Sequence, residues 1–578
     1  MGCKMNIHKF VTESVKETLA KVPGIAGADM SAITVEVPRV RDFGDFATNA
    51  AMILSKQLGQ SPREIADALS PHLKDIPAIK DISVAGPGFI NINISDDSWD
   101  RALCHILANP ETYGNSDQGK NEKINVEFLS ANPTGPVHIG HARGAILGDV
   151  LARLLAKNGF AVTKEYYIND YGHQVNVLGN SVFWRYQELF GMHDGQNIPE
   201  GSYPGEYLVQ VAQNIKDKDG DIWLGKTKEE YLPHFREFTV AAMMEIIKKS
   251  LRQIGIEFDV FTSEKNLVEN NKVTGTIDLM RKKGLVYNGC LPRPLGDTDD
   301  DWVPEEQLLF KAKEFGDDAD RVVARANGAI TYFASDIAYH FDKFERRFKK
   351  QVDIWGADHG GYVKRIKAAV GAVTDNKAEL DILLCQIVSL EKDGKPFRMS
   401  KRAGNFVMIE DVLEEIDADV LRLFMVTKSP DTQMSFDLEK AKEQSKDNPV
   451  YYIQYAHARA NSVLKKYNEI FGGPFQPAEK IDGYFADAAD AEKAVVRMLG
   501  DYPSVIETAG RNKTPHTLTK YLEELAGLFH SLWSANGVKL LCEDDKALTD
   551  RRMLLVTALK NVIANGLNAI GVKPKESM

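Results

Sequence analysis

Ile124-Asn-Val-Glu-Phe-Leu129 and the segment that follows it, Ser130-Ala-Asn-Pro-Thr-Gly-Pro-Val-His-Ile-Gly-His141, decide the fold. The first segment predicts a buried strand, and a helix is expected after the loop, from about Gly140 to Lys157. Phe160-Ala-Val-Thr-Lys-Glu-Tyr-Tyr-Ile168 predicts a second strand. A strand, a helix and another strand in this order form a βαβ unit, so the sequence predicts an α/β domain with a parallel sheet.

The strand pattern returns at Gln351-Val-Asp-Ile-Trp-Gly356 and at Leu380-Asp-Ile-Leu-Leu-Cys-Gln-Ile-Val388. The α/β domain is therefore expected to extend over about 120–440. A long, acidic and mixed stretch at about 175–320 separates the two parts of the strand pattern. We expect this stretch to be an insertion in the domain rather than part of its core.

Different patterns flank the α/β domain on each side. Residues 1–115 alternate helical patterns with short strand-like runs, including Phe89-Ile-Asn-Ile-Asn-Ile94 after a Gly-Pro-Gly turn, and predict a small α+β domain. Residues 446–578 are almost wholly helical in pattern and predict a helical bundle. Its helical runs are expected at 451–470, 486–509, 514–536 and 547–568.

Composition excludes several classes of protein. Hydrophobic residues make up 43% and charged residues 26% of the 578, which is typical of a globular chain rather than a disordered one. The five cysteines are far apart in sequence, which excludes a CxxC metal site and a disulfide scaffold and favours a reducing compartment. The net charge of −11 has the wrong sign for a nonspecific nucleic-acid coat. We expect a cytoplasmic protein with no membrane partner.

The loop after the first strand has the residues of a nucleotide site. In an open parallel sheet this position lies at the carboxyl ends of the strands, where ligands bind. His138 and His141 are three residues apart at the expected start of the helix, so both imidazoles can lie beside phosphates bound at the helix N-terminus. Gly140 lets the backbone approach a flat ligand without a Cβ in the way.

A second, basic motif lies more than 250 residues downstream. The segment Lys392-Asp-Gly-Lys-Pro-Phe-Arg398-Met399-Ser400-Lys401-Arg402 contains five basic residues and one acidic one, and glycines flank it. Such a segment can neutralise charge on a triphosphate.

Together the two motifs resemble the HIGH and KMSKS signatures of class I aminoacyl-tRNA synthetases. Arg398 stands in place of the first lysine of the second signature, and Arg402 in place of its final serine. Further strings resemble arginyl-tRNA synthetases in particular, over essentially the whole chain. They are Glu127-Phe-Leu-Ser-Ala-Asn-Pro-Thr-Gly-Pro136, Met399-Ser-Lys-Arg-Ala-Gly-Asn-Phe406, Ala418-Asp-Val-Leu-Arg-Leu-Phe424, Asn448-Pro-Val-Tyr-Tyr-Ile-Gln-Tyr-Ala-His-Ala-Arg459, Gly44-Asp-Phe-Ala-Thr-Asn49 and Gly86-Pro-Gly-Phe-Ile-Asn91.

This resemblance implies a Rossmann-like catalytic domain that ligates L-arginine to its tRNA through an arginyl-adenylate. It implies that His138, His141 and Lys401 are catalytic, and that ATP is also bound by Gly140, Arg398, Met399 and Ser400. ATP would bring Mg²⁺ with it, and no structural metal in the protein is expected.

The resemblance also implies where arginine and tRNA bind. Tyr332 and Asp336 are four residues apart, as an aromatic face and a carboxylate for a guanidinium would be. The expected arginine-binding residues are Glu127, Ser130, Asn132, His141, Tyr332, Asp336, Asp358 and His359. The helical domain would read the anticodon arm of tRNA(Arg), with Tyr451, Gln454, Tyr455 and Arg459 as candidates. The N-terminal domain would contact the tRNA elbow, and we expect a monomer.

Three alternatives remain open at this point. Another class I synthetase, such as a cysteinyl one, would need a zinc site, for which the cysteine spacing offers no place. A HIGH-type nucleotidyltransferase would leave the flanking domains without a role. A noncatalytic RNA-binding paralogue predicts broken motifs, whereas His138, His141 and Lys401 are all present.

Overall fold

The computed structural model describes residues 6–25, 27–38, 40–292, 304–392, 394–396, 407–534 and 538–578. Contacts divide the chain into two compact units. One comprises residues 119–443, and the other comprises residues 1–118 together with residues 444–578.

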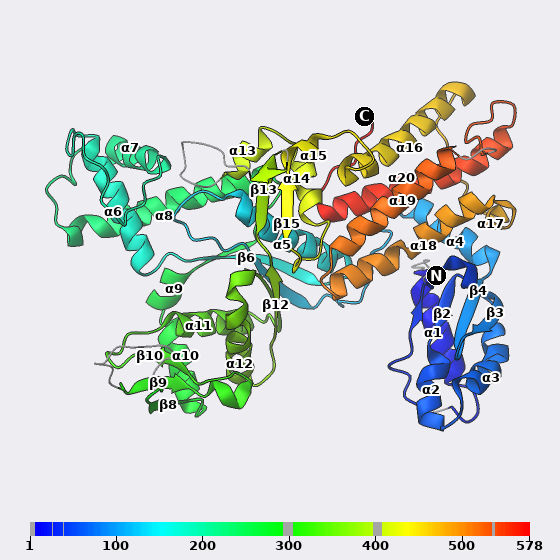
Figure 1. Cartoon of the computed structure of the whole chain (residues 1–578), viewed down its shortest axis with the longest axis horizontal. Helices are drawn as coiled ribbons and strands as arrows, with labels where there is room; N and C mark the ends of the chain where they lie inside the picture. The colour runs from blue at the N-terminus through cyan, green and yellow to red at the C-terminus, as the bar shows by residue number, and fades with distance from the viewer. Residues whose placement is uncertain are drawn as a thin grey trace. The chain divides into compact units, whose positions relative to one another are not determined.

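The unit of residues 119–443 is built on a five-stranded parallel sheet with the order β12-β11-β5-β6-β7 (Figure 1). The strands are β5 (Lys123–Phe128), β6 (Ala161–Ile168), β7 (Val260–Ser263), β11 (Lys350–Gly356) and β12 (Glu379–Cys385). Helix α5 (Ile139–Lys157) connects β5 to β6 and completes the βαβ unit. The predicted parallel α/β fold is therefore confirmed.

Helix α5 packs very closely on the sheet. A side chain at Gly148 would overlap the Phe128 ring of β5, so glycine is required for this approach. Arg143 of α5 is also buried, and its guanidinium donates to the carbonyls of Gln386, Ser429 and Thr432. These contacts fix the N-terminal end of α5 at the carboxyl edge of the sheet.

The expected insertion at about 175–320 is divided in the structure, because β7 joins the central sheet. Before β7 lie three helices that share their own apolar core: α6 (His173–Glu188), α7 (Tyr207–Asp219) and α8 (Lys228–Gln253). After it lie α9 (Glu264–Glu269), α10 (Lys272–Lys282), β8 (Val286–Gly289), β9 (Gln307–Phe310), β10 (Arg321–Ala324) and α11 (Tyr332–Glu345). Strand β7 has only four residues, too few for a periodic signal.

The same unit ends with short elements around a three-stranded sheet of order β14-β13-β15. They are α12 (Val363–Val373), β13 (Val388–Lys392), β14 (Lys395–Pro396), α13 (Ile409–Leu413), α14 (Ala418–Met425), β15 (Met434–Asp437) and α15 (Leu438–Lys442).

The other unit combines a small antiparallel sheet, of order β1-β2-β4-β3, with helices. The hairpin predicted around Gly86-Pro-Gly88 is present between β3 and β4. The N-terminal elements are α1 (Ile7–Leu19), β1 (Val35–Glu36), β2 (Phe46–Thr48), α2 (Ala50–Leu58), α3 (Pro62–Lys74), β3 (Ile79–Ala85), β4 (Phe89–Ile94) and α4 (Asp96–Ala108).

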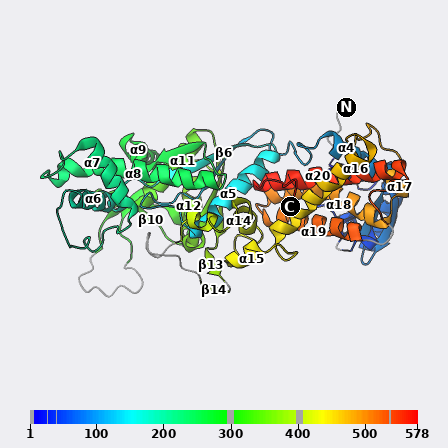
Figure 2. The ribbon, with the colours of Figure 1, turned by 90° about the horizontal axis from the view of Figure 1, so that it is seen from above.

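The C-terminal residues form the predicted helical bundle. Its helices are α16 (Pro449–Phe471), α17 (Tyr484–Asp487), α18 (Asp490–Arg511), α19 (His516–Ser534) and α20 (Lys546–Ile570), of which α16 and α20 run alongside each other (Figure 2). Among the described residues, α20 alone is long and apolar enough to cross a membrane. Most of it is buried in this unit, as a core helix would be.

Candidate active site

A cavity of about 570 Å³ lies at the carboxyl ends of β5, β11 and β12. Its wall is formed by the loop between β5 and α5, by α11 and by the segments that follow β11 and β12. It brings together most of the residues singled out in the sequence, namely Glu127, Ser130, Asn132, His138, Gly140, His141, Asp336, Asp358 and His359.

The loop before α5 is held in an unusual conformation from two sides. Leu129 and Ser130 have positive φ angles of 70° and 37°, which L-residues rarely adopt. The Tyr166 hydroxyl donates to the Ala131 carbonyl (2.7 Å), and the Tyr207 hydroxyl of α7 donates to the Thr134 carbonyl (2.7 Å). The loop is thus fixed by the sheet and by the helical insertion together.

The rings of His138 and His141 lie against each other at the start of α5, with an angle of 31° between their planes. Their ring centroids are 3.7 Å apart. The His138 Nδ1 accepts from the Gly140 N–H (3.2 Å), and the His141 Nδ1 accepts from the His138 N–H (3.3 Å). Burial lowers the pKa of His138, and burial with the charge of His138 lowers that of His141 to about 4. Both rings are therefore neutral, with the ring proton on Nε2.

The chain downstream of the second motif is attached to this same place. Arg398, Met399, Ser400 and Lys401 lie outside the described residues. The Ile139 N–H donates to the Val407 carbonyl (2.9 Å), and the Ile409 N–H donates to the Val137 carbonyl (3.3 Å). Val407 and Ile409, which follow the second motif in the sequence, therefore lie beside the first motif.

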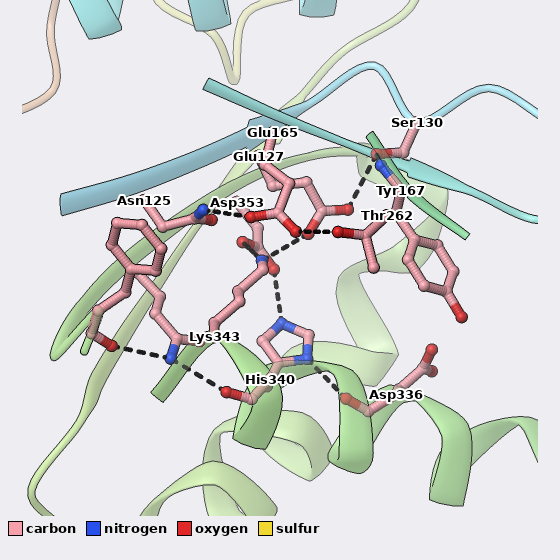
Figure 3. A network of polar contacts seen from close by, with 12 residues as sticks. Asn125, Glu127, Ser130, Glu165, Tyr167, Thr262, Asp336, His340, Lys343 and Asp353 are labelled. Carbon is pink, nitrogen blue, oxygen red and sulfur yellow. Dashed lines mark hydrogen bonds and ion pairs between the residues drawn. The ribbon is translucent and has the colours of Figure 1, made fainter. Parts of the chain in front are cut away.

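A row of three buried carboxylates crosses the sheet at the floor of the cavity. Glu165 of β6, Glu127 of β5 and Asp353 of β11 are paired across neighbouring strands. Lys343 of α11 donates to Glu127 Oε2 (2.6 Å) and to Asp353 Oδ1 (3.0 Å), as Figure 3 shows. Arg346, the C-cap residue of α11, forms an ion pair with Glu165 (2.8 Å).

These contacts shift the acidities of the floor. Burial raises the pKa of Glu127, and the Lys343 ammonium opposes that rise. Burial also acts against ionisation of Asp353, but the Lys343 and His340 cations hold its pKa below the ordinary value. Glu127, His340 and Asp353 are spaced closely enough to bind a metal ion, yet the Lys343 ammonium already lies between the two carboxylates.

Asp336 of α11 has a different environment. Its Oδ2 accepts a hydrogen bond from the Tyr362 hydroxyl (2.5 Å). Burial raises the pKa of Asp336 to about 6, which the Tyr362 hydrogen bond and the His340 cation partly oppose. The pKa of the neighbouring Glu264 is raised to about 7, first by burial and then by the charge of Asp336. Asp336 is thus a carboxylate that a cationic ligand would stabilise strongly.

Other predicted residues lie at or beyond the rim. Tyr332 is the first residue of α11, is 64% exposed and does not line the cavity; its hydroxyl lies near Gly172. Asp358 and His359 line the rim and are exposed, with His359 Nε2 lying 3.5 Å from Asp358 Oδ2. Asn132 is exposed, and its amide donates to Gln174 of α6 (3.1 Å).

Several cavity residues were not identified from the sequence. They are Tyr167, Tyr339, His340, Asp353 and Tyr362, with Lys343 beneath them. Two of these residues, His340 and Lys343, could have been identified from the sequence, because they follow Asp336 at helical spacing. Tyr167 is of interest because its buried hydroxyl has no hydrogen-bond partner among the described residues.

The candidate RNA-binding residues lie on α16. Tyr451 and Tyr455 are stacked (5.6 Å between centroids), and the Arg459 guanidinium lies 4.0 Å from the ring centroid of Trp533, which is 40% exposed. Gln454 is buried instead, and its amide donates to the Lys573 carbonyl (3.2 Å).

Comparisons with known proteins agree along the whole chain. The model of the class I (R) tRNA synthetase catalytic domain matches residues 102–464. The model of the arginyl-tRNA synthetase N-terminal domain matches residues 9–94, and that of the DALR anticodon-binding domain matches residues 453–578.

Relatives of similar length are also found. Proteins named arginine–tRNA ligase from Ruegeria pomeroyi and Roseobacter denitrificans are both 46% identical over the full length of both chains. The fold matches a Thermus thermophilus arginyl-tRNA synthetase (TM-score 0.75, 20% identity, covering 99% of this chain and 100% of that one). It also matches a Plasmodium falciparum arginyl-tRNA synthetase (TM-score 0.72, 14% identity, covering 99% of each chain).

Proposed function

This chain belongs to the arginyl-tRNA synthetase family, and from that membership we propose that arginine and ATP react in the cavity between His138, His141 and Asp336. The enzyme is a class I arginine–tRNA ligase, which uses ATP to attach arginine to tRNA(Arg). The observation that supports this location best is the meeting of the neutral histidine pair and the Asp336 carboxylate in one cavity.

Asp336 would bind the guanidinium of arginine. A planar guanidinium donates two parallel hydrogen bonds to a carboxylate, and Tyr362 holds Asp336 in place. Asn132 and His141 would bind the ammonium and carboxylate end, with Ser130 holding the loop. Glu127 would act through its bonds to Ser130 (2.9 Å) and Lys343, while Asp358 and His359 would contact arginine at the rim. Tyr332 would reach the substrate only from outside the cavity.

The reaction would proceed in two steps on this site. The arginine carboxylate attacks the α-phosphate of ATP in line, giving arginyl-adenylate and pyrophosphate. The Nε2–H groups of His138 and His141 donate to phosphoryl oxygens as charge develops there. Lys401, with Arg398, Met399 and Ser400, would neutralise the triphosphate, and Gly140 would let the nucleotide approach α5. The terminal 2′-hydroxyl of the tRNA then attacks the adenylate carbonyl.

We propose that Mg²⁺ reaches the site with the nucleotide. The group Glu127, His340 and Asp353 is engaged by Lys343, so it does not suit a second cation. Mg²⁺ keeps most of its water and binds substrate phosphates readily, which fits a site without a protein cage.

Arginine binding should depend on pH because of Asp336. Its pKa is raised to about 6, so the carboxylate is ionised above that pH and protonated below it. The guanidinium stays charged throughout. We expect KM for arginine to rise by about tenfold per pH unit as the pH falls below 6. Aminoacylation rates between pH 5 and 8 would measure this, and a flat KM would contradict it.

The partly exposed aromatic and basic surface of α16 and α19 would bind the anticodon arm, through Tyr451, Tyr455 and Arg459. Gln454 would support that surface by its bond to the C-terminal segment. Residues 1–115 would contact the tRNA elbow.

We expect Arg459→Ala to raise KM for tRNA by about tenfold, because stacking on an unpaired base is lost. KM for arginine should stay unchanged. Lys520→Ala removes an exposed cation from α19 of the same bundle and is the matched control. An equal rise in KM for tRNA in the two variants would mean that only the loss of a positive charge weakens tRNA binding, and not the loss of stacking.

We also propose that the enzyme is a cytoplasmic monomer, and the widely spaced cysteines suit a reducing compartment. Light scattering should then give a mass near 64.3 kDa. A mass of twice that value would overturn the proposal.

Aminoacylation of total tRNA with single amino acids tests the function directly. Arginine should be attached, and cysteine should not. Adenylate formation without any transfer to tRNA would favour a nucleotidyltransferase instead.

A further inference from the structure

The cations of α11 match the carboxylates of the sheet in spacing. His340, Lys343 and Arg346 are three residues apart, which is about 4.5 Å along a helix axis. Neighbouring strands are about 4.8 Å apart. Helix α11 supplies His340 for the carboxylate of β11 and Lys343 for that of β5 (Figure 3), and its C-cap residue Arg346 supplies the cation for that of β6.

The hydrogen bonds of His340 require it to be a cation. Its Nδ1 lies 2.8 Å from the Asp336 carbonyl oxygen, and its Nε2 lies 2.8 Å from Asp353 Oδ2. A carbonyl and a carboxylate only accept, so both ring nitrogens must donate. His340 is itself buried, and the pKa of Asp353 is low enough to keep that carboxylate ionised.

The floor of the cavity is therefore balanced in charge. Three carboxylates of the sheet, those of Glu165, Glu127 and Asp353, meet three cations, which belong to His340 and Lys343 of α11 and to its C-cap residue Arg346. Asp342, which Arg346 also contacts, is paired with Lys272. Asp336 lies one helical turn before His340, and its side chain receives its hydrogen bond from a neutral hydroxyl. The remaining acidic residue of the cavity wall, Asp358, is exposed at the rim.

We propose that Lys343 and His340 are specificity-determining positioning residues. They neutralise Glu127 and Asp353, so that among the described residues lining the cavity below its rim Asp336 is the carboxylate left to face the single positive charge of the arginine side chain. This inference rests on the proposed arginine site. Excess negative charge in the floor would admit other cationic amino acids, and excess positive charge would repel arginine.

The two signs of imbalance give opposite results, which a merely structural role would not. Glu127→Gln leaves one cation in excess and should raise KM for arginine at least tenfold, with kcat within threefold. Lys343→Met leaves one carboxylate in excess and should lower the inhibition constant of lysine, used as the probe, at least tenfold. The double variant restores the balance and should bring both values within threefold of the parent.

Aminoacylation kinetics and melting temperatures of the full chain would be measured for all variants. Lys272→Met with Glu345→Gln, which removes an exposed ion pair at the end of α11, is the matched control. If Lys343→Met does not fold, Glu127→Gln and the double variant still make the comparison, since a buried ion pair can be replaced as a pair.

If KM for arginine is as high in the double variant as in Glu127→Gln, the proposed charge balance is wrong. If Asp336→Asn also raises KM for arginine in that case, the proposed arginine site still stands. That result would also favour direct contact between Glu127 and arginine. If Asp336→Asn leaves KM for arginine unchanged, the proposed site fails, and the charge balance fails with it.

Discussion

Asp336→Asn is expected to lower kcat/KM for arginine by about 30- to 4,000-fold. Removing one partner of a buried, hydrogen-bonded charge pair costs about 2–5 kcal/mol, and each 1.4 kcal/mol is about tenfold. The Asn side chain keeps an oxygen that can accept from Tyr362, so the wall of the cavity should remain in place. Most of the loss should appear in KM for arginine, and KM for ATP should change little.

Steady-state aminoacylation at saturating ATP and tRNA would measure this loss. Glu345→Gln is the control, because it makes the same chemical change at an exposed residue of the same helix. It should leave kcat/KM within about twofold, since exposed ion pairs contribute little. An unchanged KM for arginine in Asp336→Asn would mean that Asp336 does not bind the guanidinium.

His141→Asn is expected to lower kcat by about a hundred- to a thousandfold, the usual cost of losing one donor to developing charge. The Asn oxygen can replace Nδ1 as acceptor for the His138 N–H, so the start of α5 is preserved. The Nε2–H donor is lost. KM for arginine should stay within about threefold if the histidine acts mainly on the transition state.

His141→Gln makes the complementary change. Its amide can donate near the position of Nε2, but it lacks the acceptor near Nδ1. The account therefore predicts more residual kcat in His141→Gln than in His141→Asn, measured in single-turnover experiments. The opposite order would mean that the ring matters for the helix start rather than for the phosphate.

Much of the fold follows from local pattern. The βαβ unit is recognisable because the strand pattern of β5 is followed by a Pro- and Gly-containing loop, after which α5 begins. The bundle helices are recognisable because they are long: α16 has 23 residues and α20 has 25. Strand β7 gives no such signal, so its place in the sheet depends on tertiary contacts alone.

The residues of the site likewise differ in how far the sequence predicts their positions. His138 and His141 belong to one continuous sequence motif, so their closeness to each other could be predicted from the sequence. The charged floor depends on the register of β6, β5 and β11, which joins Glu165, Glu127 and Asp353 from distant parts of the chain. The family resemblance, together with a spacing of four residues, placed Tyr332 with Asp336. In the structure Tyr332 is the first residue of α11, and its side chain is exposed there.

Arginine-dependent exchange of pyrophosphate into ATP tests the central claim most directly, because it reports adenylate formation in the cavity. It should be run with each amino acid, with and without total tRNA, on the parent chain and on Asp336→Asn. We predict exchange with arginine in the parent chain and its loss in Asp336→Asn. Exchange that depends on another amino acid, or arginine exchange that Asp336→Asn leaves intact, would contradict it.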